Sequence, residues 1–296
     1  MRIQGGLGNQ LNTYGLGRAL AQYVGADLVL DAEDYRSRTY KTGEKYRWPY
    51  YLDKLNVPER LASIEEMEGV LGTVDHSELE YQPGIFEFVK ANYNGDRFHV
   101  NCMGGDWRYH EPVVGVLREQ LTPLTGLSAT KQGLLEEIRS VESVGLHVRL
   151  GDYVGNPDCF ILPPEYYYDC TYIIDRSVRD PKVFIFTDSP EFLRGNIRVD
   201  LPCTLVEGNT AVEDLMLLSA CRHKILANSS FSFWAARLDS RKGGVVLAPD
   251  TCYLPGLRFK EVPRPSWPPE WRSVPVRIND GYREIMKTRR DTGVFT

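Results

Sequence analysis

The second half of the chain alternates between short apolar segments and helical patterns, and this alternation restricts the fold more than any other feature. Strands are predicted at 144–150, 183–187, 203–206, 224–227 and 244–248. Helices are predicted between them at 164–179, 212–221 and 231–239. Repeated strand–helix–strand units are joined by right-handed crossovers and give a parallel sheet covered by helices. The sequence therefore predicts an α/β fold.

The first of these strands ends in charged and polar residues. In VGLHVRLGDY, His147 and Arg149 point to one face of the strand, whereas Val148 and Leu150 point to the other. Open α/β sheets bind ligands beyond the C-terminal ends of their strands. The guanidinium of Arg149 can make two charge-assisted hydrogen bonds to one phosphate group. The segment alone leaves two interpretations open, a phosphate site or an edge strand with solvated charges.

The N-terminal segment MRIQGGLGNQ predicts a short strand, a glycine turn and a helix. Glycines let the backbone approach a ligand, and a helix start offers N–H groups with a partial positive charge. Gly6 and Gly8 have this placement, but Leu11 stands where the dinucleotide-binding pattern GxGxxG needs its third glycine. A tight turn without a ligand is the simpler interpretation of this segment alone.

Two further turns follow predicted strands. Asn228, Ser229 and Ser230 come after the strand at 224–227, where such residues commonly cap a helix but also suit a diphosphate. The aromatic stripe of the next helix is more typical of a core than of a ligand platform. Asp188 follows the strand at 183–187 and has an alternative role as a helix cap before a proline.

Four segments together resemble the α-1,2-fucosyltransferases, part of a wider group that includes the protein O-fucosyltransferases. GGLGNQ, HVRLGDY, FTDS and NSSFSFW occur in that family's order and rough spacing, over about residues 5–247. The resemblance implies a GT-B-type glycosyltransferase with two Rossmann-like domains facing a cleft. Residues 1–140 would form the acceptor-side domain and 141–296 the GDP-fucose-binding domain, with the C-terminal tail packing across both.

The implied reaction is the inverting transfer of L-fucose from GDP-β-L-fucose to the 2-hydroxyl of a β-galactoside. GDP-fucose is then a co-substrate, and no cofactor and no metal are expected, since the chain contains no Asp-x-Asp tripeptide. Two alternatives stay open. One is a transferase that uses a related GDP-sugar or another acceptor such as a protein. The other is an inactive module that binds nucleotide sugars or glycans.

The resemblance also assigns residues to the donor and to catalysis. The donor-binding candidates are His147, Arg149, Asp188, Asn228, Ser229, Ser230, Phe231, Gly6 and Gly8. Among them, His147 and Asp188 correspond to the guanine and ribose side, and Arg149 with the serine turn corresponds to the diphosphate. The catalytic candidates are Arg149, Asp152 and Asn9.

Three interpretations of the proton acceptor remain open. Asp152 is the leading candidate, but it can instead fix its loop by pairing with Arg149 or with backbone N–H groups. In a dissociative transition state, Asn9 orienting the hydroxyl suffices without a strong base.

On the acceptor side, the candidates are Gln10, Trp107 and Tyr109, with His110 beside them. Aromatic side chains stack on the apolar faces of sugars, although most aromatic residues are simply structural. The sequence departs from the family at Leu150, where a second arginine is usual. Strand alternation directs this position away from Arg149, so the loss of the second arginine need not remove the phosphate ligand.

The composition limits the partners. The formal net charge of −5 gives no indication of nucleic-acid binding. The longest apolar runs fall short of the ~20 residues that a membrane span needs, and no signal peptide is visible. The six cysteines show no CxxC spacing, which argues against a zinc site. We therefore expect a cytoplasmic enzyme, peripheral membrane association being left open.

Overall fold

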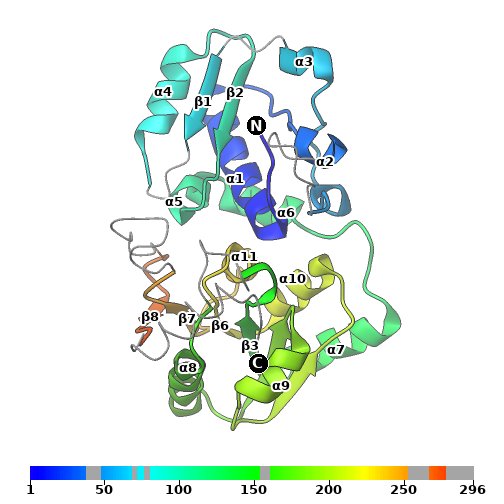
Figure 1. The fold of residues 1–296 in the computed structure, drawn as a ribbon, viewed down its shortest axis with the longest axis vertical. Coiled ribbons are helices and arrows are strands. Elements are labelled where there is room, and N and C mark those ends of the chain that lie inside the picture. The colour runs from blue at the N-terminus through cyan, green and yellow to red at the C-terminus, as the bar shows by residue number, and fades with distance from the viewer. Residues whose placement is uncertain (38–47, 69–71, 77–80, 154–160, 253–266, 278–296) are drawn as a thin grey trace, which may run out of the picture. The chain divides into compact units, whose positions relative to one another are not determined.

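A computed structural model of the chain describes residues 1–37, 48–68, 72–76, 81–153, 161–252 and 267–277. The chain divides into two compact units, Met1–Gly126 (unit 1) and Leu127–Thr296 (unit 2). Both contain parallel strands with helices around them, so the fold is mixed α/β (Figure 1). No described helix combines the length and the apolar composition needed to cross a membrane.

Unit 2 contains a parallel sheet with the strand order β5-β4-β3-β6-β7-β8. Its strands are β3 (Glu142–Val148), β4 (Pro181–Thr187), β5 (Cys203–Val206), β6 (His223–Ile225), β7 (Val246–Pro249) and β8 (Arg272–Val274). The first five are the strands predicted from the sequence, within a few residues. The short β8 was not predicted, because three residues are too few to show the alternation of apolar and polar side chains that marks a strand.

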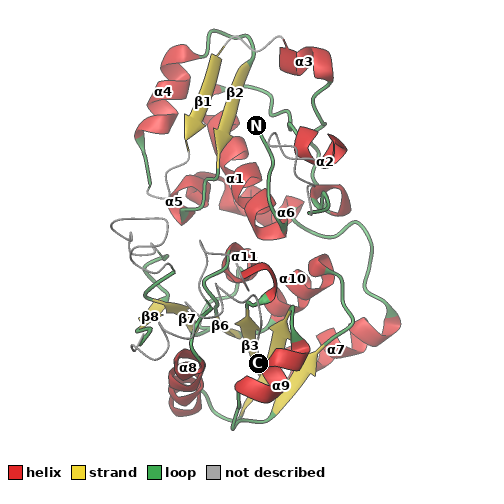
Figure 2. Ribbon diagram, viewed as in Figure 1, coloured by secondary structure: helices red, strands yellow, loops and turns green. Residues whose placement is uncertain are grey.

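The helices of unit 2 occupy the intervals between the strands (Figure 2). They are α7 (Ala129–Ser140), η3 (Gly151–Tyr153), α8 (Pro164–Ser177), α9 (Pro190–Asn196), α10 (Ala211–Ala220) and α11 (Ser230–Leu238). Local sequence explains several of the helix starts. Proline is the first residue of α8 and of α9, and a capping box between Thr210 and Glu213 starts α10.

Strand β3 is covered on both faces. Val144, Leu146, Val148 and Leu150 belong to one buried core cluster with residues of α8. The alternate positions face the other way: Gly145 lies against α10, and the His147 ring lies 5.2 Å from the Phe231 ring of α11, centroid to centroid. The predicted alternation of this strand is therefore confirmed, and Leu150 points away from Arg149.

Unit 1 is less regular. Its helices are α1 (Leu7–Val24), α2 (Glu33–Ser37), η1 (Leu52–Lys54), α3 (Ile64–Glu68), α4 (Gly84–Asn92), α5 (Trp107–His110), η2 (Glu111–Val113) and α6 (Val114–Gln120). The parallel strands β1 (Gly72–His76) and β2 (Phe98–Cys102) form a two-stranded sheet. Extended segments continue beside β2, because Arg2 N donates to Val100 O and Ile3 N donates to Asp31 O.

The sequence pattern of unit 1 predicts a helix over residues 58–68. This prediction is wrong for residues 58–63, because α3 begins only at Ile64. Leu30 N donates to Arg60 O, and Ala62 N donates to Leu30 O, so this stretch is extended. Backbone pairing with the distant residue Leu30 prevails over the local helical pattern here.

The boundary between the units precedes α7, whereas the domain boundary predicted from the sequence follows residue 140. Helix α7 goes with unit 2 because it packs against β3 and α10. In the C-terminal tail, residues 267–277 contribute β8 to the edge of the unit 2 sheet. The other tail residues, 253–266 and 278–296, lie outside the described part, so the predicted packing across both domains stays a prediction.

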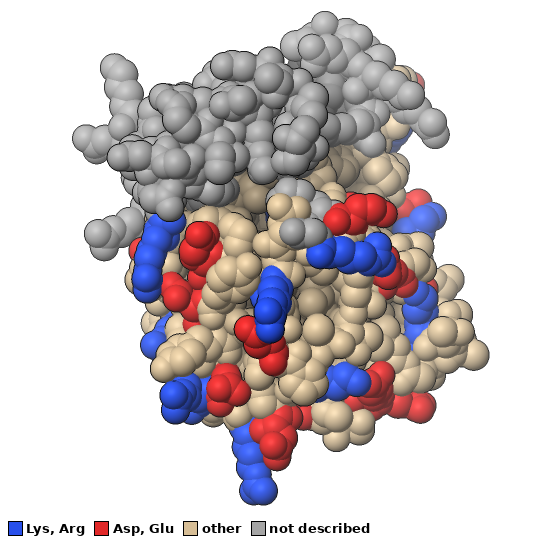
Figure 3. Space-filling model, turned by 60° about the horizontal axis from the view of Figure 1, so that its bottom comes forward, with Lys and Arg blue, Asp and Glu red and all other residues tan. Residues whose placement is uncertain are grey.

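On the face shown in Figure 3, acidic and basic side chains of the described residues are interspersed. Neither kind gathers there into one continuous patch. Exposed ion pairs of the chain, such as Arg198 with Asp200 and Arg194 with Glu207, illustrate the same mixing at short range.

A small residue is required where β3 meets α10. A Cβ atom at Gly145 would lie 2.4 Å from Leu218 Cδ1 and 3.1 Å from Cys221 Cβ, all in the buried core. We expect Gly145→Ala to lower the free energy of unfolding by about 1–3 kcal/mol through overpacking. Thermal or urea unfolding followed by circular dichroism measures this.

Gly133→Ala is the matched control, because Gly133 is exposed inside α7 and nothing lies within 4 Å of its added methyl group. This change should stabilise the protein by about 0.5–1 kcal/mol, since alanine replaces glycine in a helix interior. Equal stability of the two variants would contradict the packing described for Gly145.

Candidate functional site

The predicted donor residues of unit 2 gather where the strand order of the sheet reverses. After β3 the chain adds β4 and β5 on one side, and then β6 and β7 on the other side of β3. In open α/β sheets such a switch point is the usual ligand site, at the C-terminal ends of the strands. His147 lies in β3, Arg149 follows it, and Asn228 follows β6. We call this region, at the C-terminal ends of the adjacent central strands β3 and β6, the β3/β6 edge.

His147 is buried and electrically neutral. Its exposed fraction is 4 %, and burial, assisted by the charge of Arg149, lowers its pKa to about 3. The ring packs against Phe231, and no described group hydrogen-bonds to its Nδ1 atom. A neutral imidazole can donate one hydrogen bond and accept another, which suits a polar neutral ligand group better than an anion.

Arg149 is held by Asp188. The Nη1 atom of Arg149 lies 2.6 Å from Oδ2 of Asp188, and the exposed fractions of the two side chains are 19 % for Arg149 and 29 % for Asp188. The other carboxylate oxygen of Asp188 accepts a hydrogen bond of 3.0 Å from Leu150 N. Asp188 therefore fixes both the arginine and the backbone beside it. The helix cap weighed for Asp188 is not observed, since Ser189 is the N-cap residue of α9.

The backbone after Arg149 must be glycine at position 151. A Cβ atom at Gly151 would lie 2.4 Å from Oδ2 of Asp188, and the φ angle of Gly151 is +22°. Tyr153 follows in the η3 turn, where its N–H donates to Leu150 O at 2.7 Å. The GDY triplet thus lets the chain turn sharply around the Asp188 carboxylate.

The serine turn forms the start of α11. Asn228 and Ser229 are each 8 % exposed, and Ser229 Oγ accepts a hydrogen bond from Phe231 N at 3.3 Å. The capping role considered for this turn is therefore observed. Ser230 and Phe231 are half-buried in the first turn of the helix, so they lie at its electropositive end.

The glycine turn of unit 1 is held rigidly. Gly5 has a φ angle of +75°, and its carbonyl accepts hydrogen bonds from Gln10 Nε2 at 2.9 Å and from the Tyr35 hydroxyl at 2.8 Å. The Asn9 side chain folds over Gly5, and Gly6 lies against the Trp48 ring. Gly8 is buried in the first turn of α1.

Two of the acceptor candidates, Gln10 and Tyr109, are buried and hydrogen-bonded within unit 1. Gln10 is fully buried, and its amide also donates to Pro49 O and accepts from Tyr51 N. Tyr109 is 2 % exposed, accepts a hydrogen bond from Gln82 N at 2.7 Å, and has its pKa raised to about 12 by burial. Both residues therefore stabilise the core of unit 1, which is the commoner role for such side chains.

The remaining candidates differ in exposure. Trp107 is half-buried at the start of α5, and the fully buried His110 packs against Gly15 of α1. Asp152 belongs to the η3 turn, but its side chain lies outside the described part, so its predicted roles stay predictions. Among the residues described, no group of three His, Cys, Asp or Glu side chains is placed to hold a metal ion.

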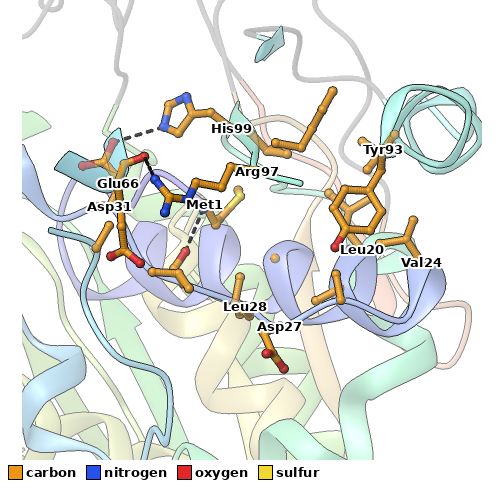
Figure 4. Close-up of a pocket in the computed structure, with 18 of the residues that line it drawn as sticks. Met1, Leu20, Val24, Asp27, Leu28, Asp31, Glu66, Tyr93, Arg97 and His99 are labelled. Atoms are coloured by element: carbon orange, nitrogen blue, oxygen red, sulfur yellow. Dashed lines mark hydrogen bonds and ion pairs between the residues drawn. The ribbon is translucent and has the colours of Figure 1, made fainter. Parts of the chain in front are cut away.

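A cavity of about 280 Å³ lies in unit 1, away from these residues. It is bordered by α1, α4 and the beginning of β2, and Figure 4 shows Tyr93, Leu20 and Val24 on one side and Asp31 with His99 on the other. His99 Nε2 lies 3.1 Å from Asp31 Oδ2. No predicted site residue lines this cavity, which lies at the opposite ends of the strands from the glycine turn.

Sequence reasoning did not assign a role to Tyr153, although it lies within the HVRLGDY segment. Its hydroxyl donates to Asn228 O at 2.9 Å, and the Arg149 guanidinium carbon lies 5.4 Å from the centre of its ring. The signal in the sequence was an aromatic residue two positions after a required glycine. Its partner, 75 residues further along the chain, was not deducible.

Comparison with known proteins identifies relatives of this chain. An α-1,2-colitosyltransferase of Escherichia coli is 27 % identical over 269 residues, which cover 84 % of this chain and 90 % of that protein. Galactoside α-(1,2)-fucosyltransferase 2 of Mus musculus is 29 % identical over 146 residues, covering 46 % of this chain and 41 % of that protein.

Among solved structures, the fucosyltransferase NodZ from Bradyrhizobium matches with a TM-score of 0.48 at 15 % identity. The match covers 79 % of this chain and 91 % of that one.

The family model for glycosyl transferase family 11 matches residues 115–272, more than half of the chain. The match includes the β3/β6 edge with His147, Arg149, Asp188 and the serine turn. On these grounds the chain belongs to glycosyl transferase family 11, as the order of its four sequence motifs predicted.

Proposed function

We propose that this protein is an inverting galactoside α-1,2-L-fucosyltransferase. It would move L-fucose from GDP-β-L-fucose to the 2-hydroxyl of a galactose-containing glycan. The observation that carries this proposal is the Arg149–Asp188 pair beside the start of α11, at the sheet's switch point. The mouse relative, which is named a galactoside fucosyltransferase, supports the choice of sugar and acceptor. The two-Rossmann-domain, GT-B arrangement and a cytoplasmic location are parts of the proposal.

In this reaction the 2-hydroxyl of the acceptor attacks C1 of fucose, and GDP leaves from the opposite face of the sugar. Negative charge then develops on the departing diphosphate. Arg149 is positioned to stabilise that charge because Asp188 already fixes the orientation of its guanidinium. The helix start at Ser229 and Ser230 adds a partial positive charge from the other side.

His147 would bind the nucleoside part of the donor through its neutral ring. Because its pKa is lowered to about 3, the imidazole carries no charge at neutral pH. It therefore avoids repelling Arg149, and its unbonded Nδ1 atom suits a hydrogen bond with a base or a ribose hydroxyl. Asn9 and Asp152 remain our candidates for orienting and deprotonating the acceptor hydroxyl.

A second candidate donor is GDP-colitose. The E. coli relative that matches most of this chain is named an α-1,2-colitosyltransferase. The features of the β3/β6 edge discussed above would contact the nucleotide rather than the sugar, so they suit any GDP-sugar. Assays with GDP-fucose and GDP-colitose, each with a panel of β-galactosides, decide between the two sugars.

The nucleotide preference can be measured without turnover. We expect GDP and GDP-fucose to bind more tightly than UDP- or ADP-sugars. Isothermal titration calorimetry with GDP, GDP-fucose and UDP-galactose tests this directly. Binding of UDP-galactose as tight as that of GDP-fucose would refute the proposed donor.

Arg149→Lys should lose most of the transfer activity, about 10²-fold or more in kcat, while the fold stays intact. Lysine keeps the charge but lacks the planar fork that holds Asp188 and a phosphate at once. Arg198→Lys is the matched control, because Arg198 pairs with Asp200 in an exposed position. Activity of Arg149→Lys within about threefold of the parent would exclude Arg149 as the leaving-group ligand.

Activity should survive the removal of divalent metals. The chain has no Asp-x-Asp tripeptide, and Arg149 is available to neutralise the diphosphate. Initial rates are measured before and after dialysis against EDTA. Complete loss of activity that Mn²⁺ or Mg²⁺ restores would contradict the metal-independent mechanism.

A further inference from the structure

Tyr153 connects the two loops of the β3/β6 edge. It stands at the end of the η3 turn after β3, and its hydroxyl donates a 2.9 Å hydrogen bond to the carbonyl of Asn228. Asn228 directly precedes Ser229, the N-cap residue of α11. The phenol thus joins the segment that carries Arg149 to the turn that begins the helix.

The ring of Tyr153 has two further contacts. It packs against the buried core cluster that contains Leu150 and the residues of α8. The guanidinium carbon of Arg149 lies 5.4 Å from the ring centre, within the range of a cation–π interaction. The ring is therefore fixed by the core and by Asn228, and in turn supports the arginine.

Arg149 is consequently held by two different groups. Asp188 binds its Nη1 atom at 2.6 Å, and the Tyr153 ring lies beside the guanidinium carbon. Asp188 fixes Arg149 relative to β4, because it directly follows that strand. Tyr153 fixes it relative to α11, because its hydroxyl is bound to Asn228.

We propose that Tyr153 is a positioning residue that sets the distance between the Arg149 guanidinium and the start of α11. This inference rests on the proposed function, in which both groups contact the same diphosphate. A diphosphate that contacts both the guanidinium and the helix start is sensitive to the distance between them, and misplacement of about 1 Å can cost about 10²-fold in rate. The effect should be larger on kcat than on binding, because the charge on the diphosphate grows as GDP departs.

Tyr153→Phe tests this with little risk to the fold, since the ring keeps its core contacts and loses only the hydroxyl. Tyr166→Phe is the matched control: the Tyr166 hydroxyl donates to the Leu226 carbonyl at 2.7 Å, but the residue belongs to α8 and not to the η3 turn that follows Arg149. We expect kcat for GDP-fucose to fall about tenfold in Tyr153→Phe and less than about twofold in Tyr166→Phe. The KM for the acceptor should not change in either variant.

A double-mutant cycle with Arg149→Lys tests whether Tyr153 acts on GDP binding through Arg149. Calorimetry should show GDP binding weakened about threefold by Tyr153→Phe in the parent and unchanged by it in the Arg149→Lys background, because the two residues act as one unit. Equal, multiplicative effects in both backgrounds, or a kcat for Tyr153→Phe no lower than that of Tyr166→Phe, would overturn the proposal. The titration of the parent protein with GDP comes before any variant is compared. If the parent bound no GDP, this titration would refute the proposed function itself.

Discussion

Both carboxylate oxygens of Asp188 are engaged with the segment that follows β3, and the geometry of the candidate site depends on this. One oxygen pairs with Arg149 Nη1 and the other accepts from Leu150 N. The chain must then turn immediately, which requires glycine at position 151 because the carboxylate fills the space of a Cβ atom. The arginine is therefore oriented before any ligand arrives, which lowers the reorganisation needed to stabilise a developing charge.

The sheet supplies the rigid frame for this arrangement. β3 is a central strand whose two faces are buried, one against α8 and the other against α10 and α11. Burial of the even-numbered side chains directs His147 and Arg149 to the opposite face. The same burial keeps His147 neutral, so the edge has one fixed positive charge rather than two competing charges.

Unit 1 uses its motif residues mainly to hold its own backbone. Gln10 and Tyr35 both bind the Gly5 carbonyl, and Trp48 lies against Gly6. A turn fixed in this way presents Asn9 in a defined place without contributing charge of its own. The candidate site of unit 2 therefore contains the guanidinium of Arg149 and the start of α11, whereas the glycine turn of unit 1 is rigid, polar and uncharged.

The sequence by itself determined the strand–helix order of unit 2, the faces of β3 and the family, because these follow from local periodicity and from contiguous motifs. It did not determine that residues 60–62 are extended, since their backbone partner Leu30 lies far away in the chain. Nor did it show that Asp188 pairs with Arg149 and accepts from Leu150 N, 38 residues before it, or that Tyr153 binds Asn228, 75 residues after it. These contacts depend on the strand order, which places the ends of β4 and β6 on either side of β3. Only the tertiary structure decides that order, because it results from how the strands pack and not from any pattern within one strand.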